Sequence, residues 1–322
     1  MHDAGRALLA PVACIVDAPD TRADTLQRLL GQADYLVVRN HLPGDLFDRP
    51  HHLRGIVRHG TGLDMIPVDV ATKQGIPVAN VPGANAQAVA EYVVGSFFNL
   101  ARRFSEMNAA LRTHDWIEAR RLSAGSSELS GKTVGIVGVG DIGQRIAHIC
   151  KAGLGMTVLG YQPDASRFPA FVRSVPLETL LMQSDFVTIN CPLTPETRHL
   201  IDLNALRAMK RTAFLVNAAR GEVIDERALA LVLGERSIAA AALDVYAEQP
   251  VPRSHAFFGL DNVVLTPHVA AITQESYAAM SVGTAKQILQ LMNCERPTYL
   301  VNPQVWAAWP YRTGNCSMNG GI

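Results

Sequence analysis

The chain has 322 residues, more than one hydrophobic core usually organises, so two domains are expected. Lys and Arg together number 29 and so do Asp and Glu, a balance that argues against binding to nucleic acid or an anionic membrane. No apolar run reaches the roughly 18–20 residues of a transmembrane helix. Five scattered cysteines argue against a metal site and a disulfide framework, and the N-terminus makes a poor secretory signal, so a cytoplasmic protein is expected.

In the first part of the chain, short apolar runs alternate with amphipathic ones. Strands are predicted at 11–18, 34–40, 53–59 and 76–81, and helices at 22–33 and 85–112. The alternation of strand and helix indicates an α/β fold with a mainly parallel sheet.

From residue 130 the alternation becomes denser. Strands are predicted at 132–139, 157–162, 186–191, 213–219, 240–246 and 262–268, with a helix from about 141 and another at 272–293. These strands are continuous apolar runs, as is typical of a sheet covered on both faces. The long helical patterns at 85–112 and 272–293 flank this block, so they are expected to carry the chain between two domains. One domain is then discontinuous, built from the beginning and the end of the chain.

The stretch TVGIVGVGDIGQRIAHI, residues 133–149, places three glycines between a predicted strand and a predicted helix. In a dinucleotide-binding turn, Gly138 permits the tight turn, Gly140 lets the backbone approach a pyrophosphate and Gly143 lets the helix pack on the strand. The N–H groups at the helix N-terminus then face the phosphates. A purely structural turn is the alternative.

Two residues depart from the usual dinucleotide pattern. Asp141 puts a carboxylate inside the glycine turn, where it can serve the helix dipole with its side chain turned away. Gln162 stands where an acid usually holds the ribose hydroxyls. Asp164 would repel a 2′-phosphate and Arg167 would attract it, so NAD is expected and NADP stays open.

Four stretches, in order, carry a resemblance to a known family. They are 58–92, the glycine turn, 192–201 with 214–229, and 242–252 with 262–270. Together they resemble the D-isomer-specific 2-hydroxyacid dehydrogenases. The resemblance implies two Rossmann-like domains: a discontinuous, flavodoxin-like substrate domain of residues 1–103 plus 286–322, and a cofactor domain of residues 104–285, with the active site in the cleft. It also implies a homodimer built through the cofactor domains. Residues 307–322 are expected to be a disordered tail.

The resemblance assigns the catalytic groups. Arg220 matches the arginine that clasps the substrate carboxylate, and His268 matches the histidine that exchanges a proton with the substrate oxygen. A surface arginine and a strand-end histidine are the structural alternatives. Most members carry a glutamate where this chain has Gln249, preceded by Glu248. Glutamine orients the imidazole without charge, so we expect a lower pKa for His268 than in relatives with the glutamate.

The same resemblance assigns the binding residues. Asp244 is expected to hold the nicotinamide carboxamide, or else to cap a turn. Thr197 either reaches the cofactor or caps a turn. Further cofactor contacts are expected from Ile142, Cys191, Pro192 and Ala218. Substrate contacts are expected from Arg58, Gly60, Thr61, Gly62 and Asn85. Arg58 would favour a substrate with a second acidic group, and a structural salt bridge is its alternative.

The sequence therefore predicts an NAD(P)-dependent oxidoreductase that moves a hydride between nicotinamide and C2 of a D-2-hydroxy or 2-oxo acid. Glyoxylate, hydroxypyruvate or a 3-phosphoglycerate-like acid would be the substrate, and no metal is required. Two alternatives stay open. One is a catalytically weak, nucleotide-sensing binding protein of the corepressor type. The other is a formate or phosphite dehydrogenase, which the glutamine beside the histidine and Asn85 keep under consideration.

Overall fold

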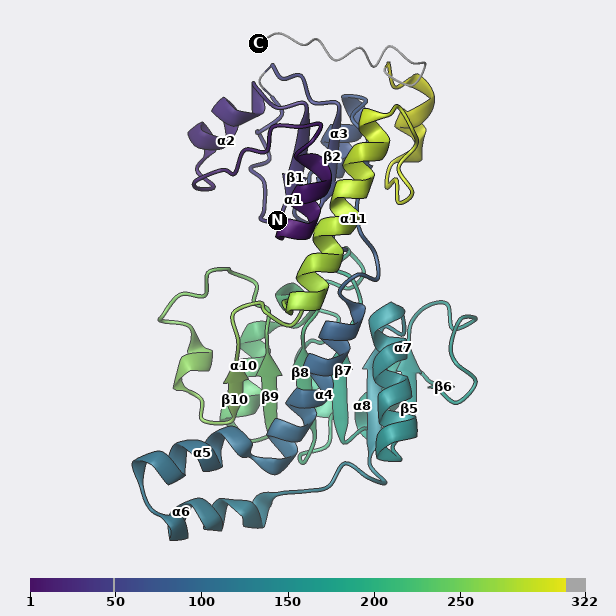
Figure 1. Ribbon diagram of the computed structural model, residues 1–322. Helices are drawn as coiled ribbons and strands as arrows, with labels where there is room; N and C mark the ends of the chain where they lie inside the picture. The colour runs from purple at the N-terminus through teal and green to yellow at the C-terminus, as the bar shows by residue number, and fades with distance from the viewer. Residues whose placement is uncertain (49, 311–322) are drawn as a thin grey trace. The chain divides into compact units, whose positions relative to one another are not determined.

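The computed structural model describes residues 1–48 and 50–310, and it divides into two compact units. The smaller unit is made of Met1–Asn85 and Ile272–Ile322, and the larger unit is Ala86–Ala271. Figure 1 shows the helices and strands of both. The beginning and the end of the chain thus contribute to one unit. The chain passes between the units at 85/86 and 271/272, earlier at both points than the expected 103/104 and 285/286.

The larger unit, all of whose residues are described, contains a parallel sheet of seven strands in the order β10-β9-β8-β7-β4-β5-β6. The strands are β4 (Thr133–Val137), β5 (Thr157–Tyr161), β6 (Arg173–Ser174), β7 (Phe186–Ile189), β8 (Phe214–Asn217), β9 (Ala240–Leu243) and β10 (Val263–Leu265). The first strand of the sheet in chain order is β4. The strands β5 and β6 follow on one side of it, and β7 to β10 follow on the other side. This order is that of a doubly wound fold, with its switch point between β4 and β7, and it confirms the predicted fold class.

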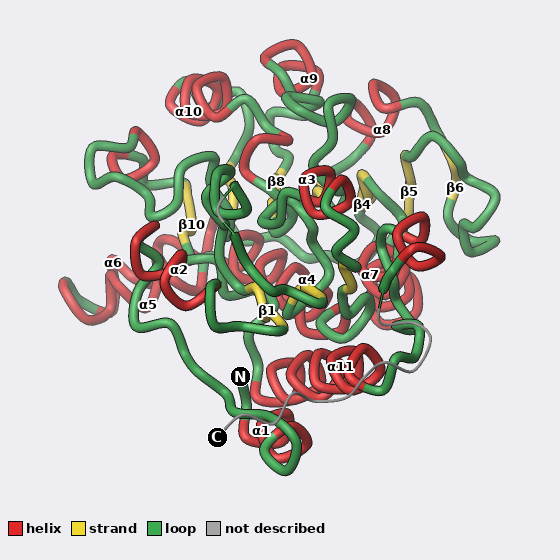
Figure 2. Tube along the Cα trace, turned by 90° about the horizontal axis from the view of Figure 1, so that it is seen from above, coloured by secondary structure: helices red, strands yellow, loops and turns green. Residues whose placement is uncertain are grey.

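Helices cover both faces of this sheet (Figure 2). One face packs against α8 (Leu177–Gln183), α9 (Leu203–Ala208) and α10 (Glu226–Gly234), and the other against α4 (Ala86–Arg102) and α7 (Asp141–His148). Neighbouring residues of one strand serve opposite faces: Leu215 belongs to the first cluster and Val216 to the second. The strands are apolar throughout because both faces are buried.

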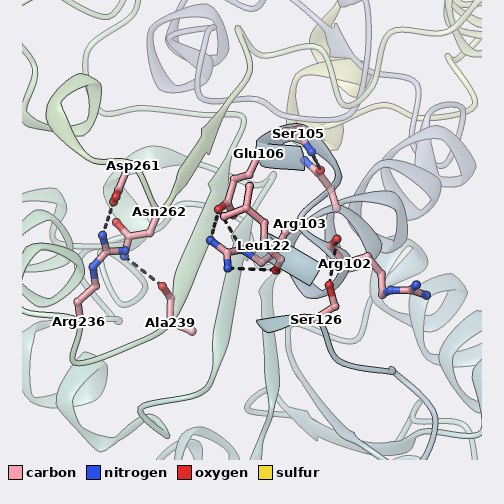
Figure 3. Close-up of polar contacts among 11 residues, drawn as sticks. Arg102, Arg103, Ser105, Glu106, Leu122, Ser126, Arg236, Ala239, Asp261 and Asn262 are labelled. Atoms are coloured by element: carbon pink, nitrogen blue, oxygen red, sulfur yellow. Dashed lines mark hydrogen bonds and ion pairs between the residues drawn. The ribbon is translucent and has the colours of Figure 1, made fainter. Parts of the chain in front are cut away.

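The helix predicted at 85–112 is interrupted. Helix α4 ends at Arg102, and Arg103 adopts a left-handed backbone conformation with φ 55° before α5 (Phe104–Thr113) begins. Helix α6 (Trp116–Arg121) follows α5 and forms a hairpin with it. At the base of the hairpin, Arg103 Nε donates to Glu106 at 2.9 Å and Nη1 to the Leu122 carbonyl at 3.4 Å (Figure 3). A periodic apolar pattern does not reveal such a break.

The described part of the smaller unit contains a three-stranded parallel sheet in the order β1-β2-β3. The strands are β1 (Tyr35–Val38), β2 (Gly55–Arg58) and β3 (Val78–Ala79), and the helices are α1 (Asp3–Leu9), α2 (Ala23–Leu30), α3 (Val68–Lys73) and α11 (Gln274–Met292). The strand predicted at 11–18 is wrong, because this segment forms a turn followed by irregular backbone. Its side chains Ala13 and Ile15 pack instead against the cluster around Leu291 of α11.

The packing of the two long helices explains where the chain divides. The buried face of α4, including Val93 and Phe97, joins the core of the larger unit. In the same way, Ile288 and Leu291 of α11 pack with Leu9 and with Val57 of β2 in the smaller unit. Each helix therefore belongs to one unit along its whole length, and the chain crosses just before it.

The first residues of the expected tail, up to residue 310, are placed in the structure. Trp309 is buried and its Nε1 donates to the Arg54 carbonyl at 3.1 Å, so the expected disorder from 307 does not hold up to residue 310. Residues 311–322 of that tail lie outside the described residues.

Cys294 is disulfide-bonded, contrary to the expectation of no disulfide. No helix within residues 1–48 and 50–310 combines the length and the hydropathy that a membrane crossing requires.

A buried histidine joins α1, β2 and α11 in the smaller unit. His59 is 4% exposed, and its Nε2 lies 2.8 Å from Oγ of Ser281. The same oxygen accepts a hydrogen bond from the backbone N–H of His2 at 2.8 Å. The Ser281 hydroxyl has two acceptor lone pairs as well as its proton, so either Ser281 or His59 can be the donor in the hydrogen bond between them. Burial, with the positive charges of Arg39 and the N-terminus, lowers the pKa of His59 to about 4.

This histidine gives folding a pH dependence. The unfolded chain binds a proton at His59 near pH 6.5 and the folded chain does so only near 4, so stability is present above 6.5 and is lost as the pH falls toward 4. We expect a loss of about 2 kcal/mol between pH 7 and pH 5 from this residue. Urea unfolding at both pH values measures it. The loss should shrink in His59→Gln and persist in a control, His52→Gln, on the exposed surface. Equal losses in both variants would contradict the assignment.

Candidate active site

The glycine turn after β4 has the shape that a dinucleotide requires. Gly138 has φ +93°, and a Cβ there would lie 2.6 Å from the backbone nitrogen of Cys191, in the loop after β7. A Cβ on Gly143 would lie 2.2 Å from the Gly138 carbonyl oxygen, so α7 packs directly on the turn. At Gly140, no described heavy atom lies within 4 Å of where a Cβ would stand. The turn is therefore closed on its inner side and open at Gly140.

The N-terminus of α7 lies at this open side. Its N-cap is Gly140, which has no side chain to cap the first N–H groups of the helix. The first N–H groups of the helix lack intrahelical acceptors and carry the positive end of the helix dipole. Asp141 is exposed in the first turn and Ile142 is half-buried. The turn lies at the β4/β7 switch point, and its residues fit the pyrophosphate of a dinucleotide.

Gln162 ties the end of β5 to the glycine turn. Its Oε1 accepts from the backbone N–H of Val139 at 3.0 Å, and its Nε2 donates to the Asp164 carbonyl. A carboxylate could make the first bond but not the second, because it has no donor. Asp164 accepts from Ser166, which lowers the pKa of that carboxyl. The sequence prediction that Gln162 faces the ribose stays a prediction.

The loop after β7 contributes Cys191, Pro192 and Thr197. Burial raises the pKa of the Cys191 thiol to about 11, so it stays protonated and unreactive near neutrality. Thr197 donates through Oγ1 to the Pro192 carbonyl at 2.7 Å and accepts from the Thr194 N–H at 2.7 Å. This is the turn-capping alternative. Ala218 lies half-buried directly after β8.

His268 and Gln249 lie together. The imidazole Nδ1 is 2.8 Å from Oε1 of Gln249, whose Nε2 donates to the Tyr246 carbonyl at 2.9 Å. The second bond fixes the amide orientation, so the oxygen faces the ring and Nδ1 must carry a proton. In the neutral imidazole, Nε2 is then the basic nitrogen. The arrangement leaves Nε2 as the atom that can exchange a proton with a ligand.

Asp244 follows β9 and holds the loop that carries His268. Its side chain is 0% exposed, and it accepts from Oγ1 of Thr266 at 2.6 Å and from the N–H groups of Val269 and Ala270 at 2.8 Å each. This is the turn-capping alternative weighed from the sequence. Contact with a nicotinamide carboxamide remains a prediction.

Arg220 follows β8, Asp244 follows β9 and His268 follows β10. These three strands are neighbours in the sheet. The turn is fixed by Asn217, whose Nδ2 donates to the Arg220 carbonyl at 2.9 Å. A Cβ on Gly221 would lie 2.1 Å from the carbonyl carbon of Tyr246. The Arg220 turn therefore lies against the segment that leads to Gln249, and the larger unit brings Arg220, Gln249 and His268 to one sheet edge.

In the smaller unit, the loop after β2 is braced by Arg58. Its Nε donates to the Gly62 carbonyl at 3.0 Å, and its Nη1 to the carbonyls of Val38 and His59 at 2.9 Å each. Neither a salt bridge nor a substrate role is needed to explain these bonds. They curve the loop so that Gly60, with φ +135°, lies inside it.

Thr61 and Asn85 lie at the same edge of the smaller sheet. Oγ1 of Thr61 lies 3.4 Å from Oδ1 of Asn85, and the Thr61 carbonyl accepts from Asn80 at 2.9 Å. The predicted substrate residues of this unit are thus brought together.

Sequence reasoning missed two residues at these edges. Arg39 follows β1 directly, is exposed and donates to the Tyr277 hydroxyl at 3.1 Å; a cation at a strand end was a usable signal. Tyr92 on α4 places its hydroxyl 2.6 Å from Oγ1 of Thr266. Nothing in the sequence links Tyr92 to Thr266.

Comparison with known proteins agrees with this geometry. Residues 94–270 match the family model described as D-isomer specific 2-hydroxyacid dehydrogenase, NAD binding domain. A D-3-phosphoglycerate dehydrogenase of Methanocaldococcus jannaschii is 37% identical over 94% of this chain, which spans 58% of that protein. A glyoxylate reductase of Thermofilum pendens is 36% identical, covering 91% of this chain and 88% of its own length.

Among solved structures, the NADPH-dependent glyoxylate/hydroxypyruvate reductase of Sinorhizobium meliloti, in complex with NADP and malonate, superposes with a TM-score of 0.82 at 26% identity. The match covers 94% of each chain.

The glycine turn yields a prediction that separates folding from cofactor binding. Gly143→Ala places a Cβ 2.2 Å from backbone, so we expect a loss of about 1–3 kcal/mol in stability. Gly140→Ala meets no described neighbour and should fold normally, yet its methyl group lies where the pyrophosphate approaches. It should weaken dinucleotide affinity tenfold or more. Urea unfolding and fluorescence titration of the reduced dinucleotide measure the two effects. Normal cofactor affinity in Gly140→Ala would contradict the placement.

Proposed function

The chain belongs to the D-isomer specific 2-hydroxyacid dehydrogenase family, and we propose that it is a reductase of small 2-oxo acids, with glyoxylate and hydroxypyruvate as the preferred class. It is a nicotinamide-dependent oxidoreductase. The observation that carries the proposal is the Gln249–His268 pair, which presents a basic Nε2 beside the strand end that bears Arg220.

We assign the chemistry to three residues of the larger unit. The Arg220 guanidinium pairs with the substrate carboxylate through two parallel hydrogen bonds and holds C2 in place. His268 Nε2 gives a proton to the carbonyl oxygen during reduction and takes it back during oxidation. Gln249 keeps Nδ1 protonated and the ring oriented. A bound nicotinamide supplies or accepts the hydride at C2.

Cofactor residues follow from the same edge of the sheet. The N–H groups at the start of α7 hold the pyrophosphate, Gly140 leaves room for it, and Gly138 lets the turn close against Cys191. Asp244, Cys191, Pro192, Thr197 and Ala218 are proposed to line the rest of the nucleotide site. We propose NAD as the usual cofactor and NADP as an accepted one, since Gln162 puts no negative charge at the ribose position.

The smaller unit contributes substrate contacts in this proposal. The backbone N–H of Gly62, with Thr61 and Asn85, is suited to an acid's carboxylate, whereas the N–H of Gly60 already donates to the Arg58 carbonyl at 3.0 Å. Arg58 already donates to three carbonyls of its own loop and its surroundings, which supports a small acid over one with a distal phosphate. The longer phosphoglycerate dehydrogenase is therefore the weaker guide to the substrate.

We also propose a homodimer formed through the hairpin of α5 and α6. Trp116 is 67% exposed and Ile117 is 70% exposed, and none of the described residues of α5 is buried. Exposed apolar side chains gathered on one hairpin mark a protein–protein interface. Sedimentation of the chain and of Ile117→Lys tests the pairing.

The central test is reduction of a panel of 2-oxo acids followed by NADH or NADPH absorbance. We expect turnover with glyoxylate and hydroxypyruvate and little with phosphohydroxypyruvate. His268→Ala should lower kcat by about 10²- to 10⁴-fold because the proton donor is lost. Arg220→Gln should lower kcat/KM by about 10- to 100-fold because a charge-assisted pair is lost.

The control variant is His52→Ala, which removes an exposed imidazole far from the hairpin in the sequence and should behave as wild type. Tight cofactor binding without turnover on any acid would contradict the reductase and would favour the nucleotide-sensing alternative.

Gln249 sets the pH range of the reaction. Gln249→Glu places a carboxylate beside Nδ1 of His268, which favours the imidazolium. Reduction needs that protonated form, so its kcat/KM should persist to a pH higher by about one unit in the variant. The pH profile of glyoxylate reduction measures this, with Glu248→Gln as the control on the adjacent exposed residue. Superimposable profiles for Gln249→Glu and wild type would refute the role.

A further inference from the structure

The backbone of His268 is held in an uncommon conformation. Its φ is +58°, in the left-handed region that non-glycine residues rarely adopt. Such a conformation persists only where the surroundings fix it. The contacts that fix this loop therefore also place the imidazole.

Most of these contacts converge on Asp244. The backbone N–H of His268 donates to the Asp244 carbonyl at 2.8 Å. The Asp244 carboxylate accepts from Val269 and Ala270 on one side of His268, and from Thr266 on the other. His268 is thus bracketed by hydrogen bonds to a single residue.

The direction of the remaining hydrogen bond can be worked out. A buried Asp244 that accepts from two backbone N–H groups is a carboxylate, so Thr266 must donate its one hydroxyl proton to it, over 2.6 Å. Oγ1 of Thr266 can then only accept from Tyr92, whose hydroxyl oxygen lies 2.6 Å away. Burial raises the pKa of Tyr92, so its hydroxyl is a donor throughout the neutral range. The chain runs from Tyr92 to Thr266 to Asp244.

We propose that Tyr92 is a positioning residue for His268, acting through Thr266 and Asp244. Tyr92 lies on α4, 174 residues from Thr266 in the sequence, and its ring packs with the cluster that includes Val93 and Phe97. The phenol is therefore fixed by the core of the larger unit. Its hydroxyl orients Thr266, which orients the carboxylate that holds the His268 loop. The role rests on the proposed reductase, in which His268 Nε2 exchanges the substrate proton.

The first test uses variants that differ by one hydroxyl. Tyr92→Phe keeps the ring and its packing and removes the donor. We expect kcat for glyoxylate reduction to fall about tenfold, with KM for glyoxylate within about twofold of wild type, because Arg220 is untouched. Thr266→Val should reproduce this loss, and Thr266→Ser, which keeps both hydrogen bonds, should retain most of the activity.

A double variant separates positioning from general damage. If the two hydroxyls act as one chain, Tyr92→Phe added to Thr266→Val should lower kcat no further than Thr266→Val alone. Independent structural effects would instead multiply. Multiplying losses, or a Tyr92→Phe variant with wild-type kcat, would overturn the proposal.

A second readout does not depend on turnover. The ring ¹⁵N signals of His268, assigned by their loss in His268→Ala, report its tautomer and titration. In wild type we expect a neutral ring protonated at Nδ1, and in Tyr92→Phe a broadened signal with a changed titration midpoint. Unchanged His268 signals in Tyr92→Phe would overturn the positioning role even if no substrate were found. Changed signals without turnover in wild type would uphold it and refute only the reductase.

Discussion

The larger unit depends on one constraint: its parallel sheet is buried on both faces. Side chains that alternate along a strand enter two apolar clusters, so the interior accepts almost no polar group. Asn217 at the end of β8 and Asp244 after β9 are two buried polar residues of this unit, and both side chains are hydrogen-bonded. Chemistry is thereby confined to the edge where the strands end, and the strand order decides which polar residues become neighbours.

That order explains why residues far apart in the sequence act as one group. Strands β8, β9 and β10 are adjacent, and they are followed by Arg220, Asp244 and His268 in turn. On the other half of the sheet, the loops after β4 and β7 meet where Gly138 lies against Cys191. The glycine turn and the proposed catalytic residues therefore follow different strands of one sheet.

The sequence predicted six of the seven strands of the larger unit because they are local apolar runs, and it missed the two-residue strand β6, whose residues are polar and exposed. It could not predict the break at Arg103, since a positive φ leaves no trace in a periodic pattern. Nor could it exclude a strand at 11–18, because Ala13 and Ile15 of this segment pack against the cluster around Leu291 of α11 although its backbone pairs with no strand. Nor could it show that Arg58 donates to the carbonyls of Gly62 and Val38 and so holds its own loop.

The role of Gln249 follows from the two hydrogen bonds that its amide makes. Its amide donates to the Tyr246 carbonyl and accepts from the imidazole, and only an amide can do both. A glutamate in the same rotamer would place a carboxylate oxygen against that carbonyl, so the loop would have to rearrange to accept it. The neutral amide therefore holds the ring by orientation alone. At Nδ1, a protonated His268 faces an amide oxygen of Gln249 and not a carboxylate.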